Sequence, residues 1–412
     1  MHPSVAGASL VCISGITDMP VIPKGGPFSF VAIISARGGG DWPSVVALAV
    51  GLHNRGHSVC LVCDRTTEAA VRGAGLTTIC VPPALEQPDI RVAIARSPVI
   101  GAETPNPLTE WAQVCAPAIR AQVQARQPMA LLSSLLCLGL AHQLASDLKI
   151  PWCFINPSFY FGEDSARPWE ADFLGISIGT FRYWFQPLMR RATMVLHATD
   201  AAFDTRPIHL PGHHHYVGPL LWEPSMVPPE FLCELGPPWV LVSVSTLPQA
   251  GEMAIAQAAI RALRHESVRV LVTVAPDHAA ELGQLPDSVH LSGYVPHSAV
   301  LAGGRLIVSH AGHGIVMKAF NYGVPMVLVP WGRDQPGVAA RAEALGVATV
   351  VRRDACNDAA MAQAVRQVLD DARYTERVRA ISKRLQTEDA VAAACKQIET
   401  FGSSAARSSA SE

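Results

Sequence analysis

Short apolar runs alternate with helix-length segments along most of the chain, and this alternation limits the fold more than any other feature. The run "FSFVAII", which begins at Phe28, is followed by a glycine-rich turn, an apolar-periodic segment at Val45–Leu52 and a second run, "SVCLVC". Strand, helix and strand in this order form a βαβ unit, in which the crossover is right-handed and the two strands are parallel. The chain is therefore predicted to be an α/β protein with parallel sheets.

The same pattern fills both halves of the chain. "MALLSS", a helix at Leu136–Leu148 and "IPWCFINPS" continue the first half, which ends near "HYVGPLL". A second series starts at "WVLVSVS" and continues through a helix at Met253–Leu263, "VRVLVTV", "LIVSH", "MVLVP" and "ATVV". We expect two Rossmann-like, doubly wound domains that face each other across a cleft, with ligands at the carboxyl ends of the strands.

The boundaries follow from composition. The stretch between Leu221 and Pro238 is too rich in proline for a helix interior or a central strand, so it is predicted to link the domains. A length of 412 residues accommodates two such domains. The predicted parts are a flexible N-terminal extension at 1–26, a first domain at 27–221, a linker at 222–237, a second domain at 238–400 and a disordered tail at 401–412.

Charge and cysteine content exclude several classes of protein. The formal net charge is −2, which provides no excess of positive charge to attract a nucleic acid or an acidic membrane surface. The most apolar stretch, Met129–Ala145, is interrupted by polar residues and too short to span a bilayer, and no secretory signal is recognised. The ten cysteines are dispersed, as in a reduced cytoplasmic protein, and Cys60 and Cys63 should point to opposite faces of a strand.

The segment "SHAGHGIVMKAF", from Ser309 to Phe320, places a strand end, a turn of small residues and a helix start in succession. Amides in the first turn of a helix have no intrahelical acceptor, and the helix dipole favours negative charge there. A diphosphate is therefore expected at Gly312, His313 and Gly314, with His310 as a further donor. Such a site needs no metal ion, and we predict none.

Downstream, "GVPMVLVPWGRDQP" places Asp334 and Gln335 just after the next strand, at the same edge of the sheet. A carboxylate accepts hydrogen bonds, and an amide both donates and accepts them. This pair suits a polyhydroxylated sugar.

These motifs resemble the donor-binding signature of family 1 glycosyltransferases, in particular the bacterial natural-product enzymes of the macrolide and glycopeptide type. The resemblance is strong over about 289–351 and weak over most of the chain. It implies the GT-B architecture, a UDP- or dTDP-sugar as donor, and no cofactor. Matched residue by residue, it implies nucleobase contacts at "YVPH", phosphate contacts in "VSVST" and "SHAGHG", and sugar contacts in "RDQ". The implied donor-binding residues are Ser245, Thr246, Tyr294, Val295, His310, Gly312, His313, Gly314, Asp334 and Gln335.

Two positions depart from that family pattern. Ile315 stands where the family usually has a threonine or serine that contacts a phosphate. Lys318 stands where many members have a glutamate that binds the ribose hydroxyls. The lysine is open to two interpretations, an added phosphate contact or a solvated side chain.

The loop after the first strand, "SARGGGDWPSVVALAVGLHNRGH", resembles the family's corresponding loop with an enlargement of two glycines. The resemblance places Asp41 at the position of the catalytic residue. A carboxylate within hydrogen-bonding distance can take the proton of an acceptor hydroxyl as that hydroxyl attacks. The alternative is that Asp41 only caps the helix that starts near Ser44.

Two further groups of residues stand out in the sequence, one aromatic and one of histidines. Aromatic residues near the end of the second βαβ unit, together with one beside Asp41, suit an apolar acceptor or, alternatively, ordinary core packing. The predicted acceptor-binding residues are Trp42, Phe159, Tyr160, Phe161 and Trp169. The run His213, His214 and His215 is predicted to lie in a strand, where consecutive side chains alternate in direction, so it is not expected to bind a metal.

Together these observations predict a metal-independent, inverting glycosyltransferase of antibiotic or other natural-product biosynthesis. It would move a hexose or deoxyhexose to a hydroxyl, nitrogen or carbon of a small, largely apolar aglycone. The expected partners are the nucleotide-sugar and this acceptor, and the protein is expected to be a monomer or homodimer. The alternative is a non-catalytic homologue that binds a nucleotide or assists another enzyme. A nucleotide-sugar epimerase or phosphorylase is disfavoured by "SHAGHG" and "RDQ", and an oxidoreductase by the lack of a GxGxxG motif.

Overall fold

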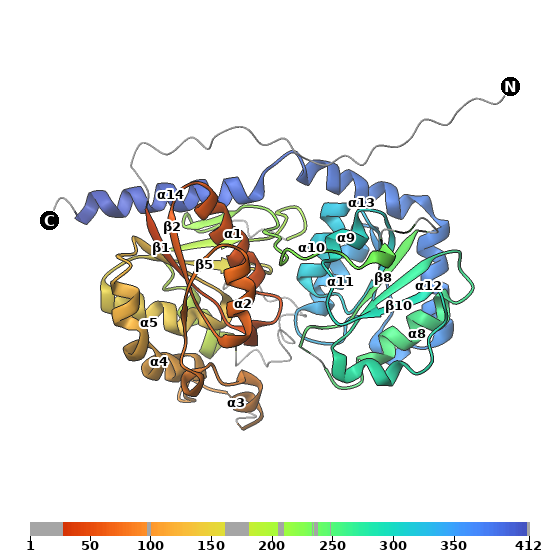
Figure 1. The fold of residues 1–412 in the computed structure, drawn as a ribbon, viewed down its shortest axis with the longest axis horizontal. Coiled ribbons are helices and arrows are strands. Elements are labelled where there is room, and N and C mark those ends of the chain that lie inside the picture. Colours follow the sequence, from red (N-terminus) through yellow and green to blue (C-terminus); the bar gives the residue numbers. More distant parts are fainter. Residues whose placement is uncertain are drawn as a thin grey trace.

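The computed structural model describes residues 28–96, 100–160, 181–204, 210–232, 234, 238–247 and 249–409. These residues form two α/β halves that lie side by side (Figure 1), as the alternating pattern predicts. The predicted extension at 1–26 lies outside the described residues.

The first half contains a seven-stranded sheet in the order β3-β2-β1-β4-β5-β6-β7, and every neighbouring pair is parallel. Its strands are β1 (Ser29–Ile33), β2 (Ser58–Cys63), β3 (Thr77–Cys80), β4 (Ala130–Ser133), β5 (Trp152–Asn156), β6 (Met194–His197) and β7 (His214–Tyr216). Its helices are α1 (Trp42–Asn54), α2 (Arg65–Gly73), α3 (Ile90–Arg96), α4 (Pro107–Gln124), α5 (Leu138–Leu148) and α7 (Gln186–Met189).

The second half contains a six-stranded parallel sheet in the order β10-β9-β8-β11-β12-β13. Its strands are β8 (Trp239–Ser243), β9 (Arg269–Thr273), β10 (Val289–Ser292), β11 (Gly304–Ser309), β12 (Met326–Leu328) and β13 (Ala348–Val350). The helices that follow in the chain are α8 (Met253–Leu263), α9 (His297–Leu301), α10 (His313–Tyr322), α11 (Gln335–Ala344), α12 (Asp358–Asp370), α13 (Ala372–Leu385) and α14 (Ala390–Ser409).

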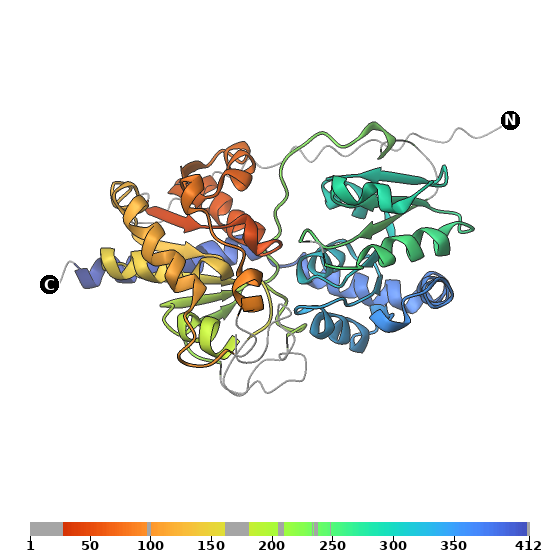
Figure 2. The same cartoon turned by 90° about the horizontal axis from the view of Figure 1, so that it is seen from below.

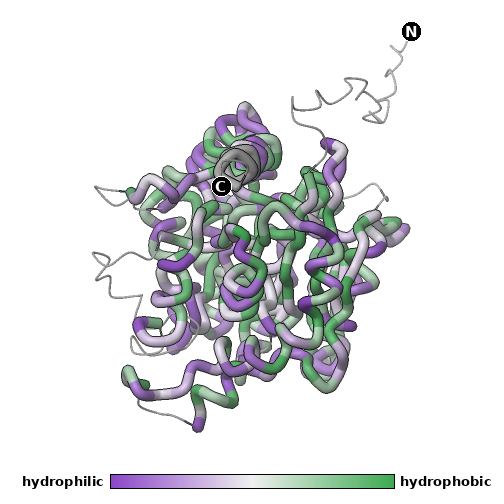
Figure 3. Tube along the Cα trace, turned by 90° about the vertical axis from the view of Figure 1, so that its left-hand side faces the viewer, coloured by the Kyte–Doolittle hydropathy of each residue, from purple (hydrophilic) through white to green (hydrophobic). Residues whose placement is uncertain are grey.

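Each sheet is covered on both faces, because successive residues of a strand point to opposite sides. In β1, Val31 and Ile33 belong to one buried apolar cluster and Phe30 belongs to the other. The hydrophobic stretches of the chain accordingly gather in the interior of the first half (Figure 3). Cys60 and Cys63 of β2 also lie in different clusters and are free thiols, so they point to opposite faces as predicted.

Helix α14 returns to the first half and packs against α1, and Figure 1 shows it lying over that half. Its residues Ala394, Cys395 and Ile398 are fully buried in the core of the first half. A Cβ atom at Gly51 of α1 would come within 2.3 Å of Val391, so only glycine permits this approach. The predicted boundary at 400, between the second domain and a disordered tail at 401–412, thus falls inside α14, whose apolar residues up to Phe401 pack on the first half. Residues 410–412 lie outside the described residues.

The two halves are joined by two crossings of the chain. One is the segment 217–229, which has neither helix nor strand and precedes a short 3-10 helix at Glu230–Leu232. Figure 2 shows this segment passing from one half to the other. The second crossing is the junction of α13 and α14. Within the described part of the chain, no helix is both long enough and apolar enough to cross a membrane.

Each sheet reverses its winding direction once, between β1 and β4 and between β8 and β11. Loops that leave the carboxyl ends of such neighbouring strands separate to opposite faces, and the space between them is where open α/β sheets bind ligands. Asp41 follows β1, and His310 follows β11. Both predicted key residues therefore lie at such positions.

Candidate active site

Asp41 lies between the 3-10 turn that follows β1 and the start of α1. One of its carboxylate oxygens, Oδ2, accepts a hydrogen bond of 3.4 Å from the amide of Leu136, in the 3-10 helix that follows β4 (Leu135–Cys137). The other, Oδ1, is buried and has no hydrogen-bond partner among the described residues. Asp41 thus joins the two loops that leave the β1–β4 switch point.

Burial raises the pKa of Asp41 from 3.8 to about 7, and hydrogen bonds from backbone amides offset only part of this effect. Asp41 occupies the position before the first residue of α1, yet its side chain makes no capping hydrogen bond there. The structure therefore does not support the cap interpretation. A carboxylate with a pKa near neutrality is suited to accept a proton.

The loop that carries Asp41 meets the second half of the protein. A Cβ atom at Gly39 would lie 3.0 Å from Cδ1 of Leu247, in the loop after β8. Gly39 has a φ of +60°, which favours glycine at this position. The loops that follow β1 and β8 are therefore in close contact.

Of the predicted acceptor-binding residues, Trp42 packs against Trp222 of the linker, with ring centroids 5.6 Å apart. Phe159 is buried beside Phe203, and Tyr160 is buried between histidine rings. Phe161 and Trp169 lie outside the described residues. In this conformation, Phe159 and Tyr160 pack within the protein, which corresponds to the core-packing alternative.

His310 follows β11 and is almost buried, with a side-chain exposure of 12%. Its Nδ1 lies 3.4 Å from the carbonyl oxygen of Ser243 and 3.8 Å from Oε1 of Glu252. Burial lowers the pKa of His310 to about 4, so the ring is neutral near pH 7. Glu252 in turn accepts hydrogen bonds from the amides of Ser245 and Gln249, which holds the loop after β8 in place.

Arg333 crosses from the loop after β12 to the loop after β8. Its guanidinium donates to the hydroxyl of Ser245 at 2.9 Å and to the carbonyl of Leu247 at 2.7 Å. Arg333 and Ala311 are two of the non-glycine residues with positive φ in the described part of the chain, at 60° and 66°. Strained backbone of this kind concentrates at functional sites, and both residues adjoin predicted donor-binding positions.

The start of α10 has the expected geometry. Gly312 precedes the helix in an extended conformation, and Gly314 is exposed in the first turn. The side chain of His313 is turned to the first half, where its Nε2 lies 2.9 Å from the hydroxyl of Thr199. Burial lowers the pKa of His313 to about 3, so this ring is neutral. Any phosphate contact by His313 would therefore use its backbone amide.

Asp334 and Gln335 lie at the start of α11 and are both engaged. The hydroxyl of Ser158, in the first half, donates to Oδ2 of Asp334 at 3.1 Å. The side-chain oxygen of Gln335 accepts hydrogen bonds from the amides of Trp331 and Gly332 at 2.8 and 2.9 Å. Gln335 is only 1% exposed, so its side chain is engaged mainly within the protein.

The remaining predicted donor residues differ in exposure. Thr246 and Tyr294 are exposed, and 51% of Tyr294 is accessible, so both can meet a ligand. Val295 is buried in the core of the second half, so only its backbone is suited to a nucleobase contact.

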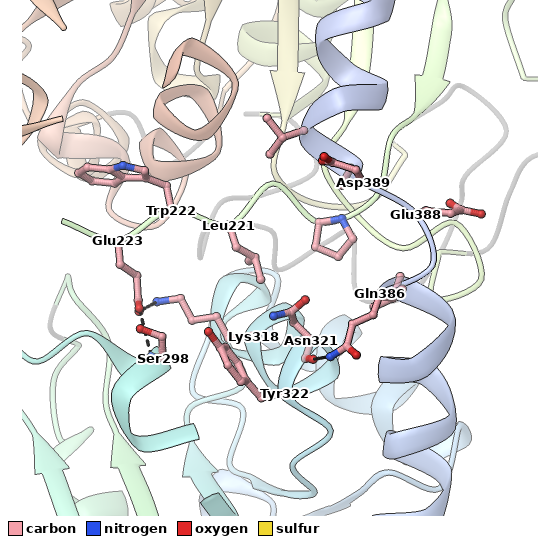
Figure 4. Close-up of a pocket in the computed structure, with 14 residues that line it drawn as sticks. Leu221, Trp222, Glu223, Ser298, Lys318, Asn321, Tyr322, Gln386, Glu388 and Asp389 are labelled. Atoms are coloured by element: carbon pink, nitrogen blue, oxygen red, sulfur yellow. Dashed lines mark hydrogen bonds and ion pairs between the residues drawn. The ribbon is translucent and has the colours of Figure 1, made fainter. Parts of the chain in front are cut away.

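Lys318, the second departure from the family pattern, is paired with Glu223 of the linker at 2.6 Å. Glu223 also accepts hydrogen bonds from the amides of His297 and Ser298 at 2.9 and 3.1 Å. Figure 4 shows Glu223 between Lys318 and Ser298. Ile315, the first departure, is buried in the core of the second half. Lys318 therefore holds the linker against the second half. This ion pair accounts for the lysine without a phosphate contact or a solvated side chain.

A pocket of about 490 Å³ lies beside this ion pair, between the linker, α10 and the α13–α14 junction. Figure 4 shows Trp222, Glu223, Lys318 and Tyr322 around it. Asp41, His310 and Asp334 do not line it. The pocket thus belongs to the crossing between the halves rather than to the switch points.

We expect Lys318→Glu to weaken the attachment of the linker, because it places two carboxylates where an ion pair stood. Loss of one partner from a partly buried, hydrogen-bonded pair costs about 1–3 kcal/mol. Chemical denaturation would measure this loss. The double variant Lys318→Glu with Glu223→Gln should recover part of it, because glutamine removes the like-charge contact while its side-chain oxygen can still accept from the amides of His297 and Ser298. Additive losses would show that the pair contributes nothing.

The histidine run contributes to packing in the first half. Nδ1 of His214 lies 3.0 Å from Nε2 of His197, and Nδ1 of His197 lies 3.0 Å from the amide nitrogen of Asn156. Burial lowers the pKa of His197 to about 3 and that of His214 to about 4, so both rings are neutral near pH 7. Among the described residues there is no cluster of three metal-ligating side chains.

The model of the erythromycin biosynthesis protein CIII-like C-terminal domain matches residues 257–400. The match covers less than half of the chain. The matched range, here called the CIII-like domain, includes the α10 terminus, His310, Asp334 and Gln335, whereas Ser245 and Glu252 precede it.

Curated proteins of similar sequence match parts of the chain. The chain is 30% identical over 194 residues to 4'-demethylrebeccamycin synthase of Lentzea aerocolonigenes, a match that covers 46% of this chain and 45% of that protein. The matches cover less than half the length of the curated relatives.

Solved structures cover more of the chain at lower identity. The calicheamicin glycosyltransferase CalG4 aligns with a TM-score of 0.68 at 20% identity, over 91% of this chain and 98% of its own. The spinosyn rhamnosyltransferase SpnG aligns with a TM-score of 0.69 at 18% identity, over 90% and 100%. This likeness establishes the predicted GT-B architecture, in which the CIII-like domain forms most of the second half.

The structure adds four residues that the sequence did not indicate. Glu252 and Arg333 support the loop after β8, Ser158 binds Asp334, and Glu223 pairs with Lys318. Arg333 directly precedes the predicted sugar-binding pair in sequence, and this adjacency was the one available signal. Ser158 and Glu223 act across separations of 176 and 95 residues. Glu252 acts on the loop just before it and on the distant His310.

Proposed function

We propose that this chain is a metal-independent, inverting glycosyltransferase. It would transfer a hexose or deoxyhexose from a UDP- or dTDP-sugar to a hydroxyl, nitrogen or carbon of a small, apolar acceptor. The observation that carries this proposal is the pairing of the two switch points. Asp41, a buried carboxylate with a pKa of about 7, lies at one of them, and the loops of both switch points meet through Gly39 and Leu247.

With a hydroxyl acceptor, the proposed reaction is a direct displacement. Asp41 takes the proton of the acceptor hydroxyl while the hydroxyl oxygen forms a bond to the anomeric carbon. The bond from that carbon to the diphosphate breaks on the opposite side, so the configuration inverts. The electron pair leaves with the nucleoside diphosphate, whose charge is balanced by the amides at the start of α10 and by His310.

The named relatives support this class of substrate. SpnG has been solved in complexes with the spinosyn aglycone and with thymidine diphosphate. The glycosyltransferase VinC has been solved with dTDP. A thymidine or uridine diphosphate sugar and an aglycone are therefore the ligand classes to test first.

The test is an incubation with UDP-glucose, dTDP-glucose or dTDP-rhamnose and a panel of flavonoid, polyketide and sterol acceptors. Mass spectrometry should detect an acceptor enlarged by one sugar, and the proton coupling at the anomeric carbon should report inversion. A retained configuration would contradict direct displacement. If a nucleotide binds but no combination of donor and acceptor gives a product, the non-catalytic homologue would be favoured.

We expect activity to survive chelation by EDTA. The start of α10 and His310 are proposed to supply the positive field that a divalent ion supplies in other transferases. Initial rates before and after EDTA treatment and buffer exchange would measure this. Loss of activity that magnesium or manganese restores would contradict the proposal, and zinc-restored activity would do the same.

A further inference from the structure

The two nitrogens of His310 face different chemistry. Nδ1 points to two acceptors, the carbonyl oxygen of Ser243 and Oε1 of Glu252. Nε2 faces Gly312, where an added Cβ atom would lie 2.5 Å from it. In the neutral ring, the proton therefore belongs on Nδ1, and Nε2 carries a lone pair towards the start of α10.

A neutral ring of this tautomer cannot donate from Nε2 to a phosphate oxygen, because that nitrogen has no proton. If the ring is to bind a diphosphate through Nε2, it must take up a second proton and become an imidazolium. Three other titratable or charged groups influence the protonation of His310: Glu252 before α8, Arg333 after β12 and His297 at the start of α9. Of these, only the carboxylate favours the imidazolium.

Glu252 is placed to balance that charge. It is 3% exposed, and it accepts hydrogen bonds from two amides of the loop after β8 while facing His310. A buried carboxylate beside an imidazole is stabilised when the imidazole becomes charged. The same carboxylate therefore holds the phosphate-facing loop and supports a charged His310.

We propose that binding of a nucleoside diphosphate is coupled to uptake of a proton by His310, with Glu252 as the positioning residue that stabilises the imidazolium through Nδ1. This inference rests on the proposed function, since it requires a diphosphate at the start of α10. In the free protein, burial keeps the pKa of His310 at about 4. The negative charge of the bound diphosphate raises it, so the proton enters with the ligand.

Titration calorimetry of UDP and dTDP in MOPS and in Tris buffer at pH 7.5, which differ in ionisation enthalpy and contain no phosphate, measures the number of protons taken up. The matched control is His310→Gln, because glutamine can donate to a phosphate without titrating and also corrects for protons exchanged by the nucleotide itself. We expect wild type to take up about one proton more than His310→Gln. We also expect its affinity to fall by roughly tenfold per pH unit between pH 7 and 8, relative to that variant.

Glu252→Gln should lower the proton uptake and flatten the pH dependence. Its control is Glu399→Gln, which removes another buried glutamate that lies 3.0 Å from a histidine, His57, but in the first half. Glu399→Gln should keep the wild-type proton number. Equal proton numbers in wild type and His310→Gln, with both proteins binding nucleotide, would overturn the coupling. Absence of binding by wild type at millimolar nucleotide would instead overturn the proposed function.

Discussion

Asp41→Asn is expected to lower turnover by roughly a hundredfold or more, which is the usual contribution of a general base. Asparagine keeps the size of the side chain and removes its capacity to take a proton. Nucleotide binding should be unchanged, because Asp41 belongs to the first half and contacts the amide of Leu136 there. Initial rates with saturating donor and acceptor would measure the loss.

Calorimetry of the same variant with UDP and dTDP provides the control for folding and donor binding. A variant with normal nucleotide affinity and a nearly normal rate would show that another group takes the proton. The enlarged glycine loop, which the sequence aligns with two residues more than the family has, would then be the first place to search.

As pH rises, ionisation of Asp41 should increase the reaction rate and decrease the stability of the folded protein. Its folded pKa, about 7, lies above the value of 3.8 expected in the unfolded chain. The folded state therefore binds the proton more tightly, so the contribution of Asp41 to stability falls as pH rises from about 4 to 7. The rate requires the ionised form and should fall about tenfold per unit below pH 7.

The same shift sets the size of the effect on stability. Roughly three pKa units correspond to at most about 4 kcal/mol of lost stability above pH 7. Asp41→Asn should relieve this loss, so the variant should be more stable than wild type at pH 8 and nearly equal to it at pH 4. Urea unfolding at both pH values would measure the difference. Equal stability at both would show that Asp41 is not destabilised by burial.

The sequence predicted the parts of the site that depend on local order. Alternating apolar runs predict the strands, and the loops after β1 and β11 must then leave the carboxyl ends of their sheets. Asp41 and His310 could therefore be placed at these edges from the sequence, with help from the family resemblance. The helix predicted at Met253–Leu263 coincides with α8.

Contacts between distant segments could not be predicted in this way. Ser158 and Asp334 are separated by 176 residues, and Arg333 and Ser245 by 88. The first pairing depends on how the two halves face each other and the second on the order of the strands in one sheet, and periodicity encodes neither. The return of α14 to the first half has the same origin, since its apolar face is visible in the sequence but its partner is not.

Residue type alone also did not reveal which side-chain atoms are free to contact a ligand. His313 belongs to the predicted phosphate motif, yet its ring binds Thr199 in the other half. Gln335 was predicted to both accept and donate, yet its oxygen is used by two backbone amides. In both cases a buried polar group is satisfied within the protein, because leaving it without a partner would cost about 1–3 kcal/mol.

We propose above that a donor held at the start of α10 reacts with an acceptor activated by Asp41. The most direct measurement is the release of nucleoside diphosphate from UDP-glucose, dTDP-glucose and dTDP-rhamnose, with and without the acceptor panel. We predict release that depends on the acceptor, persists in EDTA and falls by roughly a hundredfold or more in Asp41→Asn. Release that is equal with and without acceptor, or unchanged in Asp41→Asn, would contradict it.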